Sequence, residues 1–480
     1  MIFGKRITVN RSPYGLHNSR CYLILTEAEQ EACEEPKLPA KAFVVGALTQ
    51  FALGLHAPFL QTYLVDMQTY LYGVKNFAEL GAFRSVGNFA PTVLQPAWGA
   101  TSDKLGHTKA FVAFGTLMGL TFVYLFLWAA TPLDMIIMYA IQSILFSIQI
   151  PTWLSLIGGL MGEGNRGNEL GKLGIFTNIA SLTATLISGI LAGMPGILPF
   201  LRSAFGSIGP LLFPSVESWR EVYYLPFLFT AIVGIIASII SLTIKERARD
   251  PDEPRNFPPL LRLLSQPSDF RRFSFVAVSY AFAMSMAWPY FIVVQRDWLK
   301  NSIFEIALAS VLMTATTVIF TFPFGRLSDR VGRKPVIIMG RSLLFVVPII
   351  YAFATNVWMI YIANIIAGFT TAATVNAVTA YIYDVAPVEE RSAHIAVFNT
   401  FTGVVLLLGS FLAGVFGQII LDFTANEYFP VFVMLILSGI LRFITSFFYL
   451  LIREPKQYST TIWMEFRSRI QGRRHDADLV

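Results

Sequence analysis

The chain has 480 residues, of which 55% are hydrophobic and only 14% are charged. Soluble globular proteins carry about 25% charged residues, so this composition excludes an ordinary soluble domain. The apolar residues form long blocks, and a helix of roughly 20 apolar residues crosses a hydrocarbon core of about 30 Å. In lipid every peptide group needs a partner within the structure, which helices provide. The sequence therefore predicts an all-α membrane protein whose main partner is the lipid bilayer.

Twelve apolar blocks are long enough to cross a bilayer. They cover 41–65, 78–101, 109–129, 134–160, 171–194, 225–244, 272–294, 303–325, 336–354, 357–380, 393–419 and 430–452. The segment 195–224 contains apolar pieces that prolines and Arg202 interrupt. We expect that segment to be a long external loop.

The basic residues predict the orientation of the chain. Most of the 36 Lys and Arg residues fall in the tails and in every second loop, on the side that holds the N-terminus. Positive loops stay on the cytoplasmic side, so both termini are expected there. The net charge of +6 is then a signal for topology and does not indicate a nucleic-acid partner. The predicted parts are a cytoplasmic tail 1–40, a six-helix half 41–244, a cytoplasmic loop 245–271, a second six-helix half 272–452 and a cytoplasmic tail 453–480.

The two halves of the chain carry related segments at equivalent places. Gly99-Ala-Thr-Ser-Asp-Lys-Leu-Gly106 follows the second block, and Gly325-Arg-Leu-Ser-Asp-Arg-Val-Gly332-Arg-Lys follows the eighth. In the fifth and eleventh blocks, Leu-Ala-Gly193 matches Leu-Ala-Gly414. These matches favour an internal duplication, a plan known in transporters that bind substrate near the membrane midplane between two repeats.

The segment from Gly325 to Lys334 is similar to the signature loop of the major facilitator superfamily, with Ser328 in place of the usual Ala. The copy in the first half is degenerate, because Lys104 and His107 replace its arginines. The resemblance covers about 41–452. It implies twelve helices in two six-helix repeats, a central cavity lined by helices 1, 4, 7 and 10, and solute transport by alternating access.

The same loops supply candidates for conformational gating. By the resemblance, Asp329 faces the N-terminus of a neighbouring helix, where a carboxylate meets the positive end of the helix dipole. That contact would exist in only one state of the transporter. The alternative is that these charged residues only anchor the loops at the membrane surface. The candidates are Asp103, Asp329, Arg330, Arg333 and Arg391.

Polar and aromatic residues that share a helical face inside the blocks are candidates for substrate binding. Such side chains are costly in lipid and tend to face a cavity or the bundle interior. The alternative is that they hold helices together by hydrogen bonds. The candidates are His56, Gln142, Gln149, Trp153, Tyr280, Trp288, Asn364, Thr371 and Asn376.

Charged residues within the blocks predict the charge of the solute. Arg84 lies about two turns inside the second block and Arg442 about midway along the last, whereas Asp and Glu occur only near block ends. Arg442 is interpreted as a structural residue bonded to neighbouring helices, with attraction of an anion as the alternative. Because an unpaired cation would find no deep carboxylate, we expect a small organic solute that is neutral or anionic.

Other classes of protein are weighed against this prediction. A drug/proton antiporter of the same family would usually have a deep carboxylate or an internal Gly-Pro motif in the fifth block, and neither is present. A membrane-embedded enzyme needs a catalytic group, but the five His form no such motif. A non-transporting receptor on this fold stays open. We expect no enzymatic activity, cofactor or metal, and a monomer in the cell membrane; a coupling ion is left open.

Overall fold

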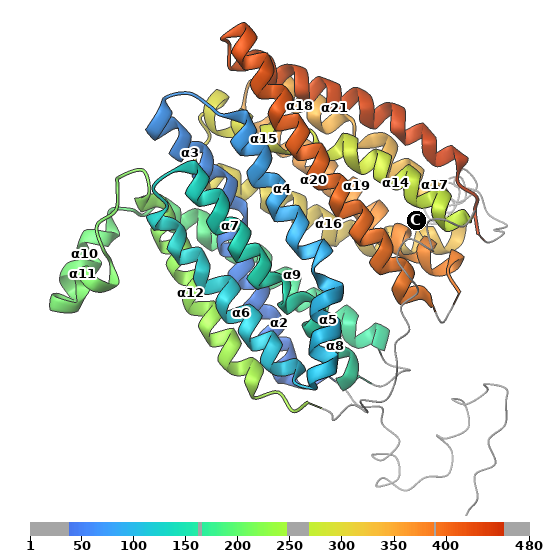
Figure 1. Cartoon of the computed structure of the whole chain (residues 1–480), viewed down its shortest axis with the longest axis horizontal. Coiled ribbons are helices and arrows are strands. Elements are labelled where there is room, and N and C mark those ends of the chain that lie inside the picture. The colour runs from blue at the N-terminus through green and yellow to red at the C-terminus, as the bar shows by residue number, and fades with distance from the viewer. Residues whose placement is uncertain (1–37, 162–165, 247–267, 388–389, 456–480) are drawn as a thin grey trace, which may run out of the picture.

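The computed structural model describes residues 38–161, 166–246, 268–387 and 390–455 (Figure 1). The predicted tails and central loop lie almost entirely outside these ranges. Within the described residues the regular structure is helical. The prediction of an all-α protein is confirmed.

The first half contains six spans, several of them built from two consecutive helices. They are α2 (Ala40–His56), η2 (Ala57–Phe59) and α3 (Leu60–Tyr72); α4 (Phe77–Val93) and α5 (Gln95–Leu105); α6 (Thr108–Leu125) and η3 (Phe126–Trp128); α7 (Pro132–Ser147) and α8 (Gln149–Leu160); α9 (Arg166–Ala192); and α12 (Glu221–Leu242). The predicted loop 195–224 also contains short helices, α10 (Ile197–Ala204), η4 (Gly206–Ile208) and α11 (Gly209–Leu212), which project away from the bundle (Figure 1).

The second half repeats this plan. Its spans are α14 (Asp269–Ser285), α15 (Trp288–Val293) and the π-helical turn η5 (Val294–Trp298); α16 (Ile303–Val331); α17 (Arg333–Leu343) and α18 (Val346–Ala352); α19 (Val357–Val385); α20 (Arg391–Thr424); and α21 (Tyr428–Phe448) with η7 (Tyr449–Leu451). The two halves lie side by side, with α4 and α20 along their contact (Figure 1).

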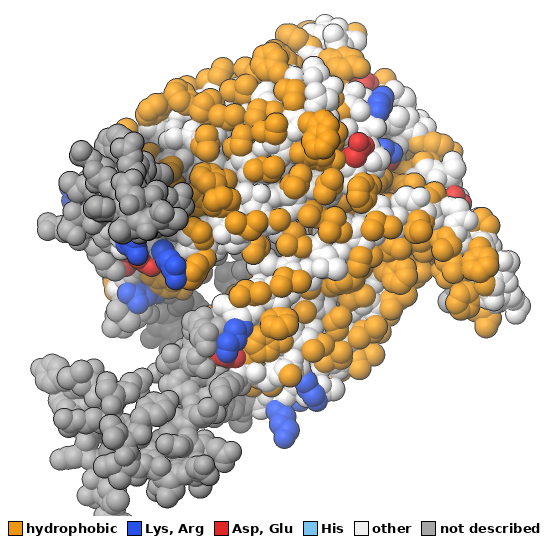
Figure 2. Space-filling model, turned by 180° about the vertical axis from the view of Figure 1, so that it is seen from behind, with side chains coloured by type: hydrophobic (Ala, Val, Ile, Leu, Met, Phe, Trp, Pro, Cys, Tyr) orange, Lys and Arg blue, Asp and Glu red, His pale blue; other side chains and the backbone are white. Residues whose placement is uncertain are grey.

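Eleven helical segments among the described residues are long and apolar enough to cross a membrane. The remaining place, the predicted second span, is taken by α4 and α5. The helix α4 has 17 residues and carries Glu79 and Arg84, which lowers its hydropathy, but it runs beside α7 and α20 within the bundle. Hydrophobic side chains cover most of the face of the bundle seen in Figure 2, where charged side chains are few. This surface fits hydrocarbon, and the twelve-helix fold is confirmed.

Prolines explain where the spans break. Proline has no N–H and its ring clashes with the carbonyl four residues earlier, so a helix bends or restarts there. Pro58, Pro96, Pro289 and Pro348 lie in the first turns of η2, α5, α15 and α18, directly after each break. Each break frees backbone carbonyls inside the bundle.

Two of the freed carbonyls have hydroxyl donors at equivalent places. Thr185 Oγ1 donates to Gly54 O at 3.1 Å, and Ser410 Oγ donates to Ser285 O at 3.2 Å. Gly54 and Ser285 each precede a proline by four residues, in the first and seventh spans, and their donors lie in the fifth and eleventh. In each half, a hydroxyl group on a neighbouring helix therefore satisfies a carbonyl that a proline has freed.

Small residues allow the halves to approach closely at two equivalent places. A Cβ added to Gly81 of α4 would lie 2.7 Å from Gly414 Cα of α20, and one added to Gly189 of α9 would lie 2.8 Å from Ala307 Cβ of α16. Gly189 is thus the counterpart of Gly414. The match of Gly193 with Gly414 predicted from the sequence is wrong by four residues, about one helical turn.

The two motif glycines have different roles. Gly325 lies inside α16. Gly332 alone makes the turn, with φ 102°, a conformation that suits a residue without Cβ. In the first half Gly99 is likewise helical, and Gly106 ends α5 with φ 67°.

The close contact between α4 and α20 predicts the effect of adding one methyl group. Gly81→Ala should reduce the free energy of unfolding by about 1–3 kcal/mol, because the new Cβ meets backbone atoms that cannot move independently. Thermal unfolding in detergent measures this change. Gly174→Ala is the control, since a Cβ there meets nothing within 4 Å. Equal stability of the two variants would contradict the proposed tight contact.

Candidate functional site

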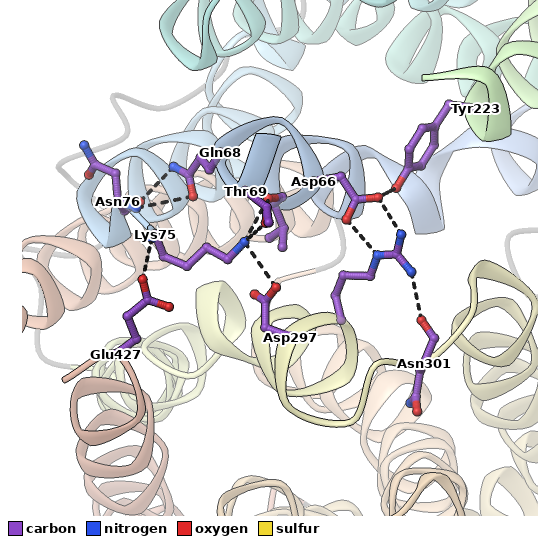
Figure 3. A network of polar contacts seen from close by, with 11 residues as sticks. Asp66, Gln68, Thr69, Lys75, Asn76, Tyr223, Asp297, Asn301 and Glu427 are labelled. Carbon is purple, nitrogen blue, oxygen red and sulfur yellow. Dashed lines mark hydrogen bonds and ion pairs between the residues drawn. The ribbon is translucent and has the colours of Figure 1, made fainter. Parts of the chain in front are cut away.

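One end of the bundle holds an ion pair between the two halves. The carboxylate of Asp66 in α3 accepts hydrogen bonds from Arg296 in η5, at 2.7 Å from Nε and 2.9 Å from Nη2 (Figure 3). Tyr223 of α12 donates to the same carboxylate at 2.6 Å, and Arg296 Nη1 donates to Asn301 O at 3.1 Å. A bidentate pair of this kind fixes geometry as well as charge. We call this end of the bundle the Asp66 end.

A second cross-half contact lies beside the first and centres on Lys75. Its Nζ lies 3.2 Å from Asp297 Oδ1, and it donates to Val65 O and to the hydroxyl of Thr69 (Figure 3). The backbone N–H of Lys75 donates to Glu427 of the second half at 3.1 Å. The side chain of Lys75 is only 3% exposed, so its ammonium depends on these acceptors.

Two hollows lie at the Asp66 end, a cavity between the halves and a surface groove of about 340 Å³ that Trp298, Asn426 and Tyr428 help to line. Lys75, Asp297 and Glu427 line a cavity of about 140 Å³. Pockets for organic ligands have volumes of about 300–1,000 Å³. This cavity can hold water but no organic solute, and the ion pairs beside it join the two halves. We therefore interpret the described state as closed at the Asp66 end.

Further into the bundle, Arg84 and Trp288 meet across the halves. The guanidinium carbon of Arg84 in α4 lies 5.1 Å from the centre of the Trp288 ring in α15. Gln61 Nε2 donates to Pro289 O at 3.0 Å, beside the same tryptophan. Trp288 is therefore a predicted substrate-binding residue that lies at the interface between the halves and contacts an arginine of the other half.

Three other predicted binding residues make hydrogen bonds within one half. Gln142 Nε2 donates to Gly119 O at 2.9 Å, and Asn364 Nδ2 donates to the hydroxyl of Tyr351 at 2.8 Å. Tyr280 donates to Arg341 O at 2.9 Å. In the described state these side chains hold neighbouring helices together, which is the alternative role expected from the sequence. Their contact with substrate stays a prediction.

The remaining predicted binding residues do not converge on one point. His56 is buried, with Nδ1 2.8 Å from Ala52 O in its own helix, and Gln149 is buried in α8. Trp153 packs against apolar residues near the start of α2. On α19, Thr371 is half-buried and Asn376 is exposed. The structure thus brings Trp288 together with Arg84 and leaves these five elsewhere.

Arg442 has the structural role expected from the sequence. Its guanidinium donates to Met284 O at 2.8 Å and to Leu344 O at 3.3 Å, and both carbonyls lie at helix breaks before prolines. The side chain is nearly fully buried. A mid-membrane arginine is tolerated here because broken helices supply acceptors.

At the opposite end, which we call the Asp329 end, charged residues of the second half pair with one another. Asp329 accepts from Arg333 Nη1 at 2.5 Å, and Arg333 Nε donates to Asp384 at 3.3 Å. Glu454 accepts the backbone N–H groups of Arg333 and Lys334 at the start of α17, at 3.2 and 2.8 Å. The carboxylate found at this helix N-terminus is therefore Glu454, and the expected contact of Asp329 in one state of the transporter stays a prediction.

The other gating candidates are spread over the same end. Arg330 is exposed, and Arg391 at the start of α20 donates from Nε to Tyr383 O at 3.1 Å. Asp103 lies on α5, and its side chain is outside what the structure describes.

Burial raises the pKa of the Glu454 carboxyl, although the hydrogen bonds from the backbone N–H groups of Lys334 and Arg333 oppose this change.

Sequence reasoning missed the pairs at the Asp66 end. Asp66, Lys75, Arg296 and Asp297 all lie near the ends of apolar blocks, where charged residues ordinarily face water. The sequence feature that could have predicted these pairs is the presence of opposite charges at the same ends of the first and seventh spans. Tyr139 was also missed, although it lies one turn before Gln142 and stacks on Phe83 at 4.3 Å between ring centres.

The chain belongs to the major facilitator superfamily, whose family model matches residues 42–294 and 273–473. It is therefore a membrane transporter of the secondary type. A tetracycline resistance protein, class H, from Pasteurella multocida is 37% identical over 111 residues, 22% of this chain and 27% of that protein. The multi-drug resistance efflux pump PmrA of Streptococcus pneumoniae is 24% identical over 386 residues, 77% of this chain and 88% of the pump.

Solved structures share the fold at low sequence identity. A mutant of the nucleoside transporter NupG aligns with a TM-score of 0.66 and 12% identity, over 86% of this chain and 100% of that chain. A bacterial homologue of the human lysosomal transporter Spinster, in an inward-facing and occupied conformation, aligns with a TM-score of 0.66 and 19% identity, over 86% and 97% of the two chains. These similarities establish the arrangement of helices.

The ion pair at the Asp66 end predicts a shift between conformations. Removing one partner of a buried pair costs about 3–5 kcal/mol. Because Arg296 is 28% exposed, we expect Asp66→Asn to destabilise the closed state by about 1–3 kcal/mol. A cysteine replacing Ser85, which is buried between α4 and α20, should then react about tenfold faster with an impermeant thiol reagent added at the Asp66 end.

Two further variants make that experiment specific. Asp269→Asn removes an exposed pair within one half and should leave the labelling rate unchanged. The swap Asp66→Arg with Arg296→Asp should restore slow labelling. Unchanged labelling in Asp66→Asn would show that the pair does not hold the halves together.

Asp329 gives a prediction that separates conformation from stability. The side chain is 66% exposed and pairs with a residue of its own half, so Asp329→Asn should change the free energy of unfolding by less than about 1 kcal/mol. Transport should still fall severalfold if Asp329 makes another contact in the opposite state. Asp422→Asn, an exposed change, is the control. Normal transport at wild-type abundance would mean that Asp329 only anchors the loop.

Proposed function

We propose that this transporter carries a neutral or anionic small organic solute by alternating access, with the described state closed at the Asp66 end. The main support is the distribution of contacts between the halves. Among described residues, cross-half hydrogen bonds and ion pairs are concentrated from Ser85 to the Asp66 end, whereas Asp329 and Arg333 bond within the second half. Contacts of this kind can break as the halves rock about a central site.

The orientation follows from the charge bias of the loops. The Asp329 end is cytoplasmic and carries both termini, and the Asp66 end is external, because Lys and Arg are concentrated on the former side. The protein acts in the cell membrane as a monomer, and transport involves no chemical step. The described state is then an inward-facing one.

The proposed solute charge rests on where the charged groups lie. Arg84 and Arg442 are inside the bundle, while Asp66 and Asp297 lie at its end and already pair with Arg296 and Lys75. A cation in the central region would meet arginine and no unengaged carboxylate among the described residues. Leaving a buried cation unpaired costs several kcal/mol, which is enough to decide selectivity.

Drug efflux by proton exchange is the competing function within the family. It is favoured by relatives that are named drug resistance proteins and efflux pumps. The observation against it is the position of the carboxylates, since a proton carrier is usually a membrane-embedded acid. Solute charge therefore separates the two functions.

Transport into proteoliposomes tests this proposal. The probes are three fluorescent solutes of similar size, one anionic, one neutral and one permanently cationic. The transport rate of the cation should be at least about tenfold lower than the rates of the other two, because the cation finds no partner charge in the protein. Liposomes without protein are the control for leakage. Robust transport of the cation alone, driven by a proton gradient, would instead establish the antiporter.

A further inference from the structure

We infer that Arg84, together with Trp288, forms a recognition site for an organic anion that carries an oxyanion group next to an aromatic or apolar body. This inference rests on the proposed function and specifies its substrate. The site joins α4 of the first half to α15 of the second. Arg84 lies seven residues, about 10 Å, along α4 from its beginning at Phe77, so it is inside the bundle and away from the ion pairs.

Arg84 is half-buried, and it differs from the buried Arg442 in how its donors are satisfied. Arg442 donates to two backbone carbonyls. Arg84 has a buried Nε without a hydrogen-bond partner, and its described cross-half contact is the face of the Trp288 ring. A ring face attracts a desolvated cation but accepts no conventional hydrogen bond. The guanidinium therefore keeps donors for an incoming acceptor.

The chemistry of this group selects an oxyanion. A guanidinium presents its N–H groups in a planar fork that matches a carboxylate or phosphate with two parallel hydrogen bonds. Such a ligand would also supply the negative charge that no described Asp or Glu supplies to Arg84. A neutral hydroxyl or amide satisfies fewer donors and brings no charge.

Aromatic groups near Arg84 favour an apolar or aromatic body next to the anion. Trp288 contributes one ring, and Phe83 stacks on Tyr139 at 4.3 Å with an angle of 20° between the rings. The hydroxyl of Tyr139 lies against Gly87, one turn along α4 from Arg84, where an added Cβ would collide with it. Gly87 thus leaves room for a phenol beside the guanidinium.

The position between the halves couples binding to movement. In the described state Arg84 contacts Trp288, and Gln61 of α3 bonds to Trp288 O and Pro289 O at 3.4 and 3.0 Å. A bound oxyanion competes with the indole ring for the same guanidinium. A bound substrate and the contact with Trp288 therefore both involve the Arg84 side chain. Binding of substrate would in this way shift the equilibrium between the two conformations of the transporter.

Binding to the full-length chain in nanodiscs tests the inference. The probes are 2-naphthoate and naphthyl phosphate as anions, and 2-naphthamide as the neutral counterpart, measured by isothermal titration. Arg84→Gln should weaken binding of both anions at least about tenfold and change binding of the amide less than twofold. Arg84→Lys should recover part of the affinity, because it keeps the charge but loses the fork.

Controls separate a local effect from misfolding and from net charge. Lys104→Gln removes an exposed positive charge at the end of α5 and should leave all three affinities unchanged. If Arg84→Gln lowers the unfolding temperature, Arg84→Lys is the second variant, and it should weaken binding of both anions more than binding of the amide because the guanidinium fork is lost. Anion affinity within twofold of wild type in a folded Arg84→Gln protein would overturn the inference, as would failure of the wild type to bind either anion.

The inference can fail while the proposed function stands. If the protein transports a neutral solute and Arg84→Gln binds anions as well as the wild type does, the anion site is ruled out and the proposed function stands. Absence of transport for every class of solute in proteoliposomes would remove the proposed function as well.

Discussion

A peptide group inside a bilayer must have a hydrogen-bond partner, and the rest of this structure depends on that constraint. Unpaired groups cost several kcal/mol in hydrocarbon, so the chain crosses the membrane as helices. Prolines then break several spans and free carbonyls at Gly54, Ser285 and Leu344. Thr185, Ser410 and Arg442 supply the missing donors. Bent spans are thus stable because specific side chains on neighbouring helices complete them.

The contacts between the halves follow a different rule. Near the middle, Gly81 meets Gly414 and Gly189 meets Ala307, so the halves touch there through small residues with no polar groups to satisfy. At the Asp66 end they are joined by ion pairs that include water-accessible partners. Small residues give a close pivot, and ion pairs at one end, with Arg296 partly open to water, give contacts that can be exchanged for water. This combination suits a molecule whose halves must separate at one end and stay packed in the centre.

The sequence predicts most of the fold because its determinants are local. Block length predicts the helices, and the matching Gly-Ser-Asp-Gly segments predict the duplication. The alignment of the fifth and eleventh spans failed by one turn, since a short Leu-Ala-Gly match carries less information than the contacts of Gly189 and Gly414.

The candidate site was predicted less well because its partners are distant in sequence. A polar face on a helix looks the same whether it borders a cavity or a neighbouring helix, so the bond of Gln142 to Gly119 O and that of Tyr280 to Arg341 O could not be foreseen. Arg84 and Trp288 were both noticed in the sequence, but their meeting depends on how two halves pack. Asp66 and Arg296 looked like ordinary charges at block ends.

Rocking of the two halves changes the distance across the Asp66 end. Spin labels at Tyr72→Cys and Asn426→Cys, two exposed positions in different halves, report this distance once Cys21 and Cys33 are replaced. We expect two distance populations whose proportions change when a transported solute is added, while their positions stay fixed. A single population that no transported solute alters would contradict transport by rocking of the two halves.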